Sequence, residues 1–296
     1  MKTWTQITFA FLLISTSQLI AQDTRPERVS VLLRCDDWGM SHSVNMAAQK
    51  VLEAGFPVSA SVMFACPWYQ EAVEILKGRT NVSVGIHLTL NAEWKNYRWG
   101  PVAGATNVPT LVDSLGYFFP TRALLFGNKP SLDEIERELR AQVKRAVSSG
   151  LRLDYVDYHM GAAVQTPEAR AIVEKIAAEY KLGISRYFGE KDVRGTFYST
   201  QPEWKLDTLL AAASALSAGG VHLFVFHAGI DTPELSALQD FNEFGPKDMS
   251  KHRQAEMDAL LSPQFQKLIH KPEFRLVNYR QLIEEMGLKT MMRPAE

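Results

Sequence analysis

An apolar, β-rich run that ends abruptly in two carboxylates constrains this chain more than any other feature. Residues 29–35 read Val-Ser-Val-Leu-Leu-Arg-Cys and are followed by Asp36, Asp37, Trp38 and Gly39. Such runs form buried strands, and α/β folds place their chemistry at the C-terminal ends of parallel strands. Two adjacent carboxylates repel each other, so a bound cation is the simplest reason for the pair. A turn or a helix N-cap is the alternative, because Asp is common in both.

Strands and helices alternate along the rest of the chain. The predicted strands cover residues 29–35, 58–64, 82–90, 153–159, 184–187, 221–227 and 275–279. The predicted helices cover residues 46–54, 67–77, 131–149, 167–180, 206–218, 251–261, 263–269 and 279–286. About seven strands that alternate with helices predict an α/β fold, a single (β/α) barrel that is a distorted TIM-like barrel.

A long irregular segment, residues 91–130, interrupts this alternation. Long loops in compact domains are often functional. Its aromatic side chains would stack on sugar rings if they were exposed, or would pack the loop onto the domain, and the sequence leaves both alternatives open. These residues are Trp94, Tyr97, Trp99, Tyr117, Phe118 and Phe119. The helix that follows begins with Ser131 and Glu134, which have the spacing of a capping box.

The first 21 residues differ from the rest and predict a secretory signal peptide. Met1 and Lys2 supply a positive start, residues 7–20 are largely apolar, and Ala21 precedes a polar stretch. A membrane-spanning helix would need a longer uninterrupted apolar run, so no stable membrane insertion is expected. The mature chain, residues 22–296, is expected to form one domain that works outside the cytoplasm, either secreted or periplasmic.

Charge and cysteine content narrow the range of partners. The formal net charge is −1, so no broad basic face for nucleic acid or anionic lipid is expected. An oxidising compartment would permit a disulfide between Cys35 and Cys66, but we favour two small buried residues. Two cysteines are too few for a zinc site of their own. The sequence leaves the oligomeric state open, with a homodimer among the states that it allows.

Candidate metal ligands and proton carriers follow four of the predicted strands: Asp36 with Asp37, His87, Asp157 with His159, and His227. In a barrel the C-terminal ends of all strands point to the same face, so residues far apart in sequence converge there. A single histidine in such a place is more often a hydrogen-bonded core residue. Three histidines and a carboxylate pair on one face instead favour a shared site.

This set of side chains matches metal-assisted hydrolysis. One carboxylate and two imidazoles are a common facial set for a divalent ion, and they leave positions open for water and substrate. One Asp and one His then remain for acid–base work, because an activated water must lose a proton and a leaving amine must gain one. The sequence therefore predicts a metal-dependent hydrolase that acts on an amide or an ester.

Four short motifs occur in a fixed order along the chain. Residues 35–41 read Cys-Asp-Asp-Trp-Gly-Met-Ser, residues 84–88 Val-Gly-Ile-His-Leu, residues 157–159 Asp-Tyr-His, and residues 226–229 Phe-His-Ala-Gly. They resemble the Asp-Asp-Phe-Gly-Leu-Ser, Gly-Leu-His-Leu, Asp-Ser-His and His-Pro-Gly motifs of the YdjC-like carbohydrate deacetylases, which are more distantly similar to NodB-type polysaccharide deacetylases. Arg253 and Glu256 also fit the closing helix of that family, and the resemblance spans residues 29–285.

The resemblance implies a role for each residue at the strand ends. Asp37, His87 and His159 would hold one divalent metal ion, most often magnesium or zinc. Asp36 would be the general base that accepts a proton from water. His227 would be the general acid for the leaving sugar amine, or would help to stabilise the oxyanion.

The resemblance also points to residues around this centre. Asp157 would orient His159 or bind a substrate hydroxyl, and Trp38 and Arg186 are further candidates for contacts with the substrate or with the site residues. Three departures from the family motifs imply a different pocket. Met160 and Gly161 follow His159, where the family often has a second histidine two residues on; Trp38 replaces a phenylalanine, and Ala228 replaces a proline.

The function implied by the resemblance is removal of acetyl groups from N-acetylated sugars or oligosaccharides, on a barrel of the glycoside hydrolase/deacetylase type. An O-acetyl esterase or another metal-dependent hydrolase, such as a phosphoesterase, is the alternative, because the same site chemistry serves all of them. A non-catalytic glycan-binding relative is a third alternative, and the complete set of catalytic residue types argues against it.

Overall fold

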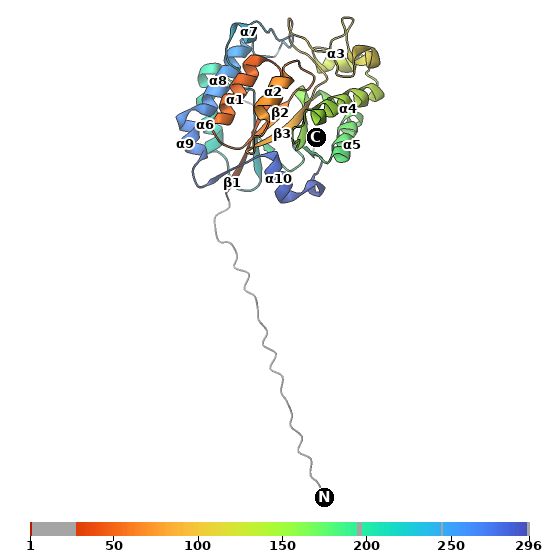
Figure 1. The fold of residues 1–296 in the computed structure, drawn as a ribbon. Helices are drawn as coiled ribbons and strands as arrows, with labels where there is room; N and C mark the ends of the chain where they lie inside the picture. Colours follow the sequence, from red (N-terminus) through yellow and green to blue (C-terminus); the bar gives the residue numbers. More distant parts are fainter. Residues whose placement is uncertain (2–27, 194–196, 244, 295–296) are drawn as a thin grey trace.

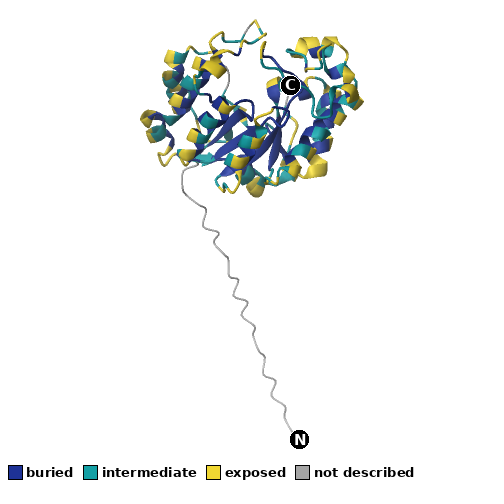
Figure 2. Cartoon of the chain, turned by 45° about the horizontal axis from the view of Figure 1, so that its top comes forward, coloured by how far each residue is buried: buried dark blue, intermediate teal, exposed yellow. Residues whose placement is uncertain are grey.

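The structure of the protein is a computed structural model that describes Met1 and residues 28–193, 197–243 and 245–294. The predicted signal peptide therefore lies outside the described residues, apart from Met1. A curled sheet runs through the centre, and helices cover its outer face (Figure 1). Figure 2 shows buried strands inside and exposed helix surfaces outside.

All strands belong to one sheet, and every pairing between them is parallel. They are β1 (Val29–Trp38), β2 (Val58–Val62), β3 (Val82–Leu88), β4 (Tyr155–Tyr158), β5 (Gly183–Ile184), β6 (Lys191–Asp192), β7 (Val221–Phe226) and β8 (Phe274–Val277). The order across the sheet is β5-β4-β3-β2-β1-β7-β6, with β8 beside the first half of β1. No pairing among the described residues joins β5 to β6, so the sheet is a curled, open barrel. The predicted α/β barrel of about seven strands is confirmed.

Helices surround this sheet (Figure 1). They are α1 (His42–Glu53), α2 (Tyr69–Leu76), α3 (Arg122–Gly127), α4 (Leu132–Ser148), α5 (Pro167–Tyr180), α6 (Lys205–Ser214), α7 (Pro233–Ser236), α8 (Met249–Leu261), α9 (Pro263–Ile269) and α10 (Tyr279–Met286). Short 3₁₀ turns cover Ala105–Asn107, Pro109–Leu111, His159–Val164, Pro202–Trp204 and Leu288–Thr290. None of the helices in the described part of the chain has the length and apolarity needed to cross a membrane.

The inner face of the curled sheet changes from apolar to polar along β1. Val31, Leu33 and Cys35 pack in the large core under the outer helices. Leu32 points the other way, into a smaller cluster that includes Tyr155 and Tyr279. These two rings lie 4.3 Å apart and, with α10, fill the N-terminal end of the barrel. The next inward-facing residues of β1, Arg34 and Asp36, are charged, so the interior becomes a polar chamber toward the C-terminal strand ends.

The start of α4 differs from the prediction. Ser131 occupies the N-cap position, but its side chain accepts no hydrogen bond from the backbone of the described helix. Glu134 instead accepts hydrogen bonds from the backbone N–H and the hydroxyl of Thr110, both at 2.7 Å. The predicted capping box is therefore wrong, because the Glu134 carboxylate accepts hydrogen bonds from Thr110 of the irregular segment instead of from the helix N-cap.

Most aromatic residues of segment 91–130 pack against the domain rather than being exposed to solvent. Trp94, Trp99 and Phe118 are buried. The Tyr97 hydroxyl donates a hydrogen bond to the carbonyl of Met40 at 2.5 Å. Tyr117 is the more exposed case, with 39% of its surface accessible. These residues mainly hold the segment against the domain.

Both cysteines are buried free thiols, so the interpretation as small buried residues is confirmed. Cys35 lies on β1 with its side chain in the core under the helices, and Cys66 lies just after β2. Burial raises the pKa of both thiols, which keeps them protonated and unreactive.

Candidate active site

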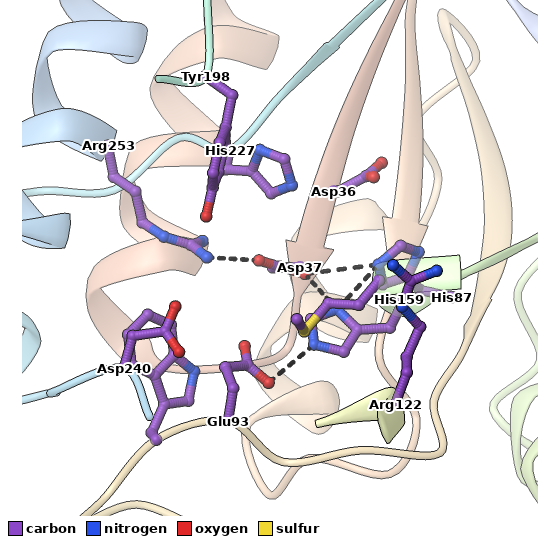
Figure 3. A pocket seen from close by; sticks show the side chains of 12 residues that line it. Asp36, Asp37, His87, Glu93, Arg122, His159, Tyr198, His227, Asp240 and Arg253 are labelled. Atoms are coloured by element: carbon purple, nitrogen blue, oxygen red, sulfur yellow. Dashed lines mark hydrogen bonds and ion pairs between the residues drawn. The ribbon is translucent and has the colours of Figure 1, made fainter. Parts of the chain in front are cut away.

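The C-terminal ends of β1, β3, β4 and β7 surround a cavity of about 340 Å³ (Figure 3). The residues that line it are Asp36, Asp37, His87, Glu93, Trp94, Arg122, His159, Met160, Tyr198, His227, Asp240 and Arg253. The five residues predicted as metal ligands or acid–base groups are all among them. The convergence expected from four separate strand ends is therefore present in the structure.

Three atoms in this cavity have the geometry of a metal-binding face. Asp37 Oδ1 lies 3.5 Å from His87 Nε2 and 3.2 Å from His159 Nδ1, and the two nitrogens are 3.3 Å apart. Neighbouring ligands about 2.0–2.2 Å from one ion would be separated by roughly 3–3.5 Å. Asp37 Oδ1 is buried and has no hydrogen-bond partner within the described residues. The three side chains therefore fit a divalent cation.

Each imidazole of this trio has a carboxylate at its other nitrogen. Asp157 Oδ1 lies 3.0 Å from His87 Nδ1, and Glu93 Oε2 lies 3.0 Å from His159 Nε2. Each carboxylate favours the tautomer that carries its proton on the ring nitrogen facing that carboxylate. The other ring nitrogen, which faces Asp37 Oδ1, then keeps its lone pair free for a metal ion. Metal-binding histidines commonly have this arrangement.

The structure assigns Asp157 to a different histidine from the one that was predicted. Asp157 faces His87, not His159, because β3 and β4 are paired so that these two residues stand side by side in register. Residues paired in this way project to the same face of the sheet. Asp157 therefore does not take the predicted place beside His159, and its other predicted role, binding a substrate hydroxyl, stays a prediction.

Glu93 takes the place beside His159, and it is not among the residues predicted from the sequence. It lies five residues beyond the end of β3, in the irregular segment. Its carbonyl accepts a hydrogen bond from Phe241 N at 2.8 Å, and Lys95 N donates to the Gln239 carbonyl at 2.8 Å. These bonds fix the loop that carries Glu93. The only local signal was a carboxylate shortly after a strand that ends in a candidate ligand.

The carboxylates also change the protonation of the two rings. Burial alone would lower the pKa of His87, but Asp157 and Asp36 more than offset this and raise the pKa to about 9. Burial opposes a charged His159 as well, but Glu93 and Asp37 raise its pKa to about 10. Without a cation, this cluster therefore holds positive charge as protons, which a divalent ion would replace.

Arg34 holds the second carboxylate of the pair. Its Nε and Nη2 donate to the two oxygens of Asp36, each at 2.7 Å. Burial would raise the pKa of Asp36, but Arg34 and His87 lower it to about 2. Arg34 Nε is also 3.2 Å from Asp157 Oδ2. Arg34 is thus a fixed cation between two carboxylates. In the sequence, only its position as a charged residue inside an apolar run indicated such a role.

Asp37 is fixed by a cation from the opposite wall. Arg253 on α8 donates from Nη2 to Asp37 Oδ2 at 2.6 Å, and both side chains are buried. Burial would raise the pKa of Asp37, but Arg253 and the two histidines hold it well below its ordinary value. The backbone of Asp37 is left-handed, with a φ of 66°, which Asp tolerates better than most residues. This turn, at the end of β1, presents Oδ1 to the histidines.

His227 lies on another wall of the cavity, just after β7. Its backbone N–H donates to Glu256 Oε2 at 2.7 Å, and its Nδ1 lies 4.0 Å from the same oxygen. The ring stands edge-on to Tyr198, with centroids 5.4 Å apart. Burial lowers the pKa of His227, so its protonated ring gives up a proton more easily than a free imidazolium does.

The remaining two candidates lie outside this cavity. Trp38 packs in the hydrophobic core, because the register of β1 shifts between Cys35 and Trp38. It is not among the described residues that line the cavity. Arg186 lines a neighbouring cavity of about 320 Å³ that shares Tyr198 and His227 with the first. Its Nε donates to Asp192 at 2.8 Å.

The fold and the site place the chain in a known protein family. The family of YdjC-like proteins matches residues 30–271, which is most of the chain. The chain belongs to this family, so the recognition made from four motifs is confirmed.

Several relatives of this chain are named carbohydrate deacetylases. The relative from Brevibacillus brevis is 34% identical over 56% of this chain and 63% of its own length. That from Thermoanaerobacter pseudethanolicus is 29% identical over 52% and 59%. The relative from Thermus thermophilus is 26% identical, over 86% of this chain and 94% of its own length. The chain thus spans about three fifths of the first two relatives and nearly all of the third.

A solved structure has the same fold. It is that of a candidate cellobiose-phosphate cleavage protein from Enterococcus faecalis V583, with a TM-score of 0.70 and 22% identity. The match covers 86% of this chain and 99% of that protein. The similarity concerns the arrangement of strands and helices.

Proposed function

We propose that the protein is a metal-dependent hydrolase that removes acetyl groups from N-acetylated sugars or oligosaccharides. One observation carries the proposal: Asp37 Oδ1, His87 Nε2 and His159 Nδ1 face one another at 3.2–3.5 Å, each ring with a carboxylate behind it. The relatives named carbohydrate deacetylases support the substrate class. The cavity, with further polar groups, is of a size for a sugar unit.

Asp37, His87 and His159 would hold the ion, with magnesium or zinc as the candidates. A divalent ion bound there would supply positive charge that polarises the acetyl carbonyl and makes water more acidic. Arg253 stabilises the ionised form of Asp37 through its bond to Oδ2, which leaves Oδ1 directed at the two rings. Arg34 similarly occupies the space between Asp36 and Asp157, where a second cation would otherwise be required.

Asp36 and His227 would move the protons. Arg34 keeps Asp36 ionised, so this carboxylate accepts a proton from the attacking water. The protonated form of His227 gives a proton to the amine nitrogen as the C–N bond breaks. The proton on Asp36 then replaces the one that His227 gave up, so the pair returns to its starting state.

The expected site of action is outside the cytoplasm, on the strength of the predicted signal peptide in residues 1–21. Cell fractionation with an antibody against the chain tests this. Recovery of the processed protein in the periplasm or the medium would support it, and recovery of unprocessed protein in the cytoplasm would contradict it.

Measured products distinguish N-deacetylation from the esterase alternative. The metal-stripped protein is supplied with single divalent ions and a panel of N-acetylglucosamine oligomers, and acetate and free amine are quantified. We expect acetate and amine in equal amounts, with a loss of about 10²–10⁴ in rate for Asp36→Asn. Acetate from O-acetylated xylan, with neither product from the N-acetyl sugars, would contradict the proposal and favour an esterase.

A further inference from the structure

Tyr198 is a cavity residue to which the proposed function gives no role. It lines the main cavity and the neighbouring one, and 42% of its surface is accessible. Its ring lies edge-on to His227 at 5.4 Å. Figure 3 shows the ring running down beside His227, with the hydroxyl ending on the side of Arg253 and Asp37. The hydroxyl is thus directed at the space between the proton donor and the metal-binding face.

A buried ion pair fixes the backbone of Tyr198 relative to His227. Lys205 is fully buried, and its Nζ donates to the Tyr198 carbonyl at 2.9 Å and to Glu256 Oε1 at 2.8 Å. The other oxygen of Glu256 accepts the His227 backbone N–H at 2.7 Å. A buried, paired lysine is costly to move, so Tyr198 and His227 are held in one arrangement.

The hydrogen-bond donors that line the cavity differ in chemical type and in position. The four carboxylates that line the cavity are acceptors. Arg253 gives Nη2 to Asp37, and Arg122 gives Nη1 to Gln165. Arg253 Nε and Nη1 and the indole N–H of Trp94 have no hydrogen-bond partner among the described residues. Tyr198 carries the one hydroxyl among the described residues that line this cavity. Partial burial, together with the carboxylates of Asp240 and Glu93, raises the pKa of Tyr198, which keeps this hydroxyl protonated and available as a donor.

We propose that Tyr198 is a catalytic residue whose hydroxyl donates a hydrogen bond to the acetyl oxygen as negative charge builds on it. The inference rests on the proposed deacetylase function and adds a specific donor to it. As the water oxygen bonds to the carbonyl carbon, a proton passes to Asp36 and the carbonyl π pair moves onto oxygen. Tyr198 keeps its own proton throughout. The electron pair on oxygen then re-forms the carbonyl double bond, the C–N bond breaks, and the leaving nitrogen takes a proton from His227.

Replacing the hydroxyl alone tests this role. Tyr198→Phe keeps the ring against His227, and Tyr180→Phe, at the exposed end of α5, is the matched control. With metal-loaded protein and an N-acetylglucosamine oligomer, we expect Tyr198→Phe to lower kcat about 10²-fold with KM within about twofold. Tyr180→Phe should behave as the wild type. The bound ion per chain and the melting temperature should be unchanged in both.

A tetrahedral mimic separates transition-state stabilisation from ordinary substrate binding. The probe is a methylphosphonamidate analogue of the acetamido group on the same sugar. Its affinity should fall in Tyr198→Phe by the same factor as kcat/KM, while the substrate KM does not follow. Tyr198→Leu, which also removes the ring, should raise KM in addition to the loss in kcat.

The outcomes distinguish this inference from the function on which it rests. Equal kcat and equal analogue affinity in Tyr198→Phe, Tyr180→Phe and the wild type would overturn the role of Tyr198 and leave the deacetylase function intact. A loss confined to KM in Tyr198→Leu would show that the ring is a stacking surface and would also overturn it. Absence of acetate release in all the proteins would overturn the proposed function as well.

Discussion

Two imidazole rings with a carboxylate behind each define the chemistry of this site at the scale of single residues. Asp157 and Glu93 turn the free nitrogens of His87 and His159 toward Asp37 Oδ1. Arg34 forms an ion pair with Asp36, and Arg253 forms one with Asp37. A buried cluster of this kind is stable only if each charge has a partner, so every member constrains the others.

Glu93 provides the most specific prediction at this scale. Glu93→Gln should weaken the binding of a divalent ion by about 10–100-fold, because His159 loses the carboxylate that directs its tautomer. Isothermal titration of zinc into the metal-stripped protein measures the affinity. The matched control is Glu71→Gln, since Glu71 contacts the half-exposed His42 at 2.8 Å on the surface. Equal zinc affinities in the two variants would contradict the role of Glu93.

The sequence predicted the residues of the centre better than their contacts. Asp36, Asp37, His87, His159 and His227 all line one cavity, because each lies at or just after the C-terminal end of a strand in the same parallel sheet. Which carboxylate contacts each imidazole ring depends on the register of the strands and on the position of a distant loop. A local sequence pattern predicts neither. Glu93 was missed for that reason.

At the scale of elements, α4 holds the irregular segment through carboxylates on its inner face. Glu138 is buried and accepts hydrogen bonds from the backbone N–H groups of Val102 at 3.0 Å and Ala103 at 2.8 Å. Gln142 donates to Glu138 at 2.7 Å and also to the Thr89 carbonyl. The segment is thereby tied to the loop that follows β3, close to His87.

The pKa of Glu138 leads to a prediction about stability and pH. Burial raises this pKa in the folded state, so the folded protein binds the proton more tightly, and the free energy of unfolding falls as pH rises through the raised pKa. Glu138→Gln cannot ionise. As the pH rises from about 4 to about 7, the free energy of unfolding of the variant should therefore increase relative to that of the wild type. Urea unfolding at both pH values measures this, and a constant difference would contradict it.

Gly85 tests the packing inside the barrel. A Cβ built at Gly85 of β3 would lie 2.3–2.6 Å from ring atoms of Tyr155. That ring packs at a tilt against Tyr279, with ring centroids 4.3 Å apart, and has little room to move. We expect Gly85→Ala to destabilise the protein by about 1–3 kcal/mol or more in urea unfolding. Gly127→Ala at the end of α3, where nothing lies within 4 Å, is the control. Equal stability of the two variants would contradict this account of the packing.

Helix boundaries could be predicted where their signals are local. The start of α5 has Thr166 before Pro167, and that of α9 has Ser262 before Pro263, and both hydroxyls cap as such sequences suggest. Glu134 shows the limit, because a tertiary contact with Thr110 replaced the local bond. The two-residue strand β6 escaped prediction because it is too short to show a period.

At the scale of the whole molecule, one curled sheet divides the protein into an apolar outer core and a polar inner chamber. Tyr155 and Tyr279 close the chamber at one end, and the cavity opens at the other, where the strands end. The site is therefore carried mainly by the rigid ends of buried strands, with Glu93, Tyr198 and Arg253 added from outside the sheet. Site residues on such elements hold their geometry better than residues on loops alone.

The most direct test of the central claim is a titration of zinc or magnesium into the metal-stripped protein, with bound ion and acetate release from an N-acetylglucosamine oligomer followed together. We expect acetate release to rise in proportion to bound ion and to level off at one ion per chain. Asp37→Asn should bind the ion weakly and release little acetate. Full acetate release by the stripped protein, or ion binding and turnover in Asp37→Asn equal to the wild type, would contradict the account.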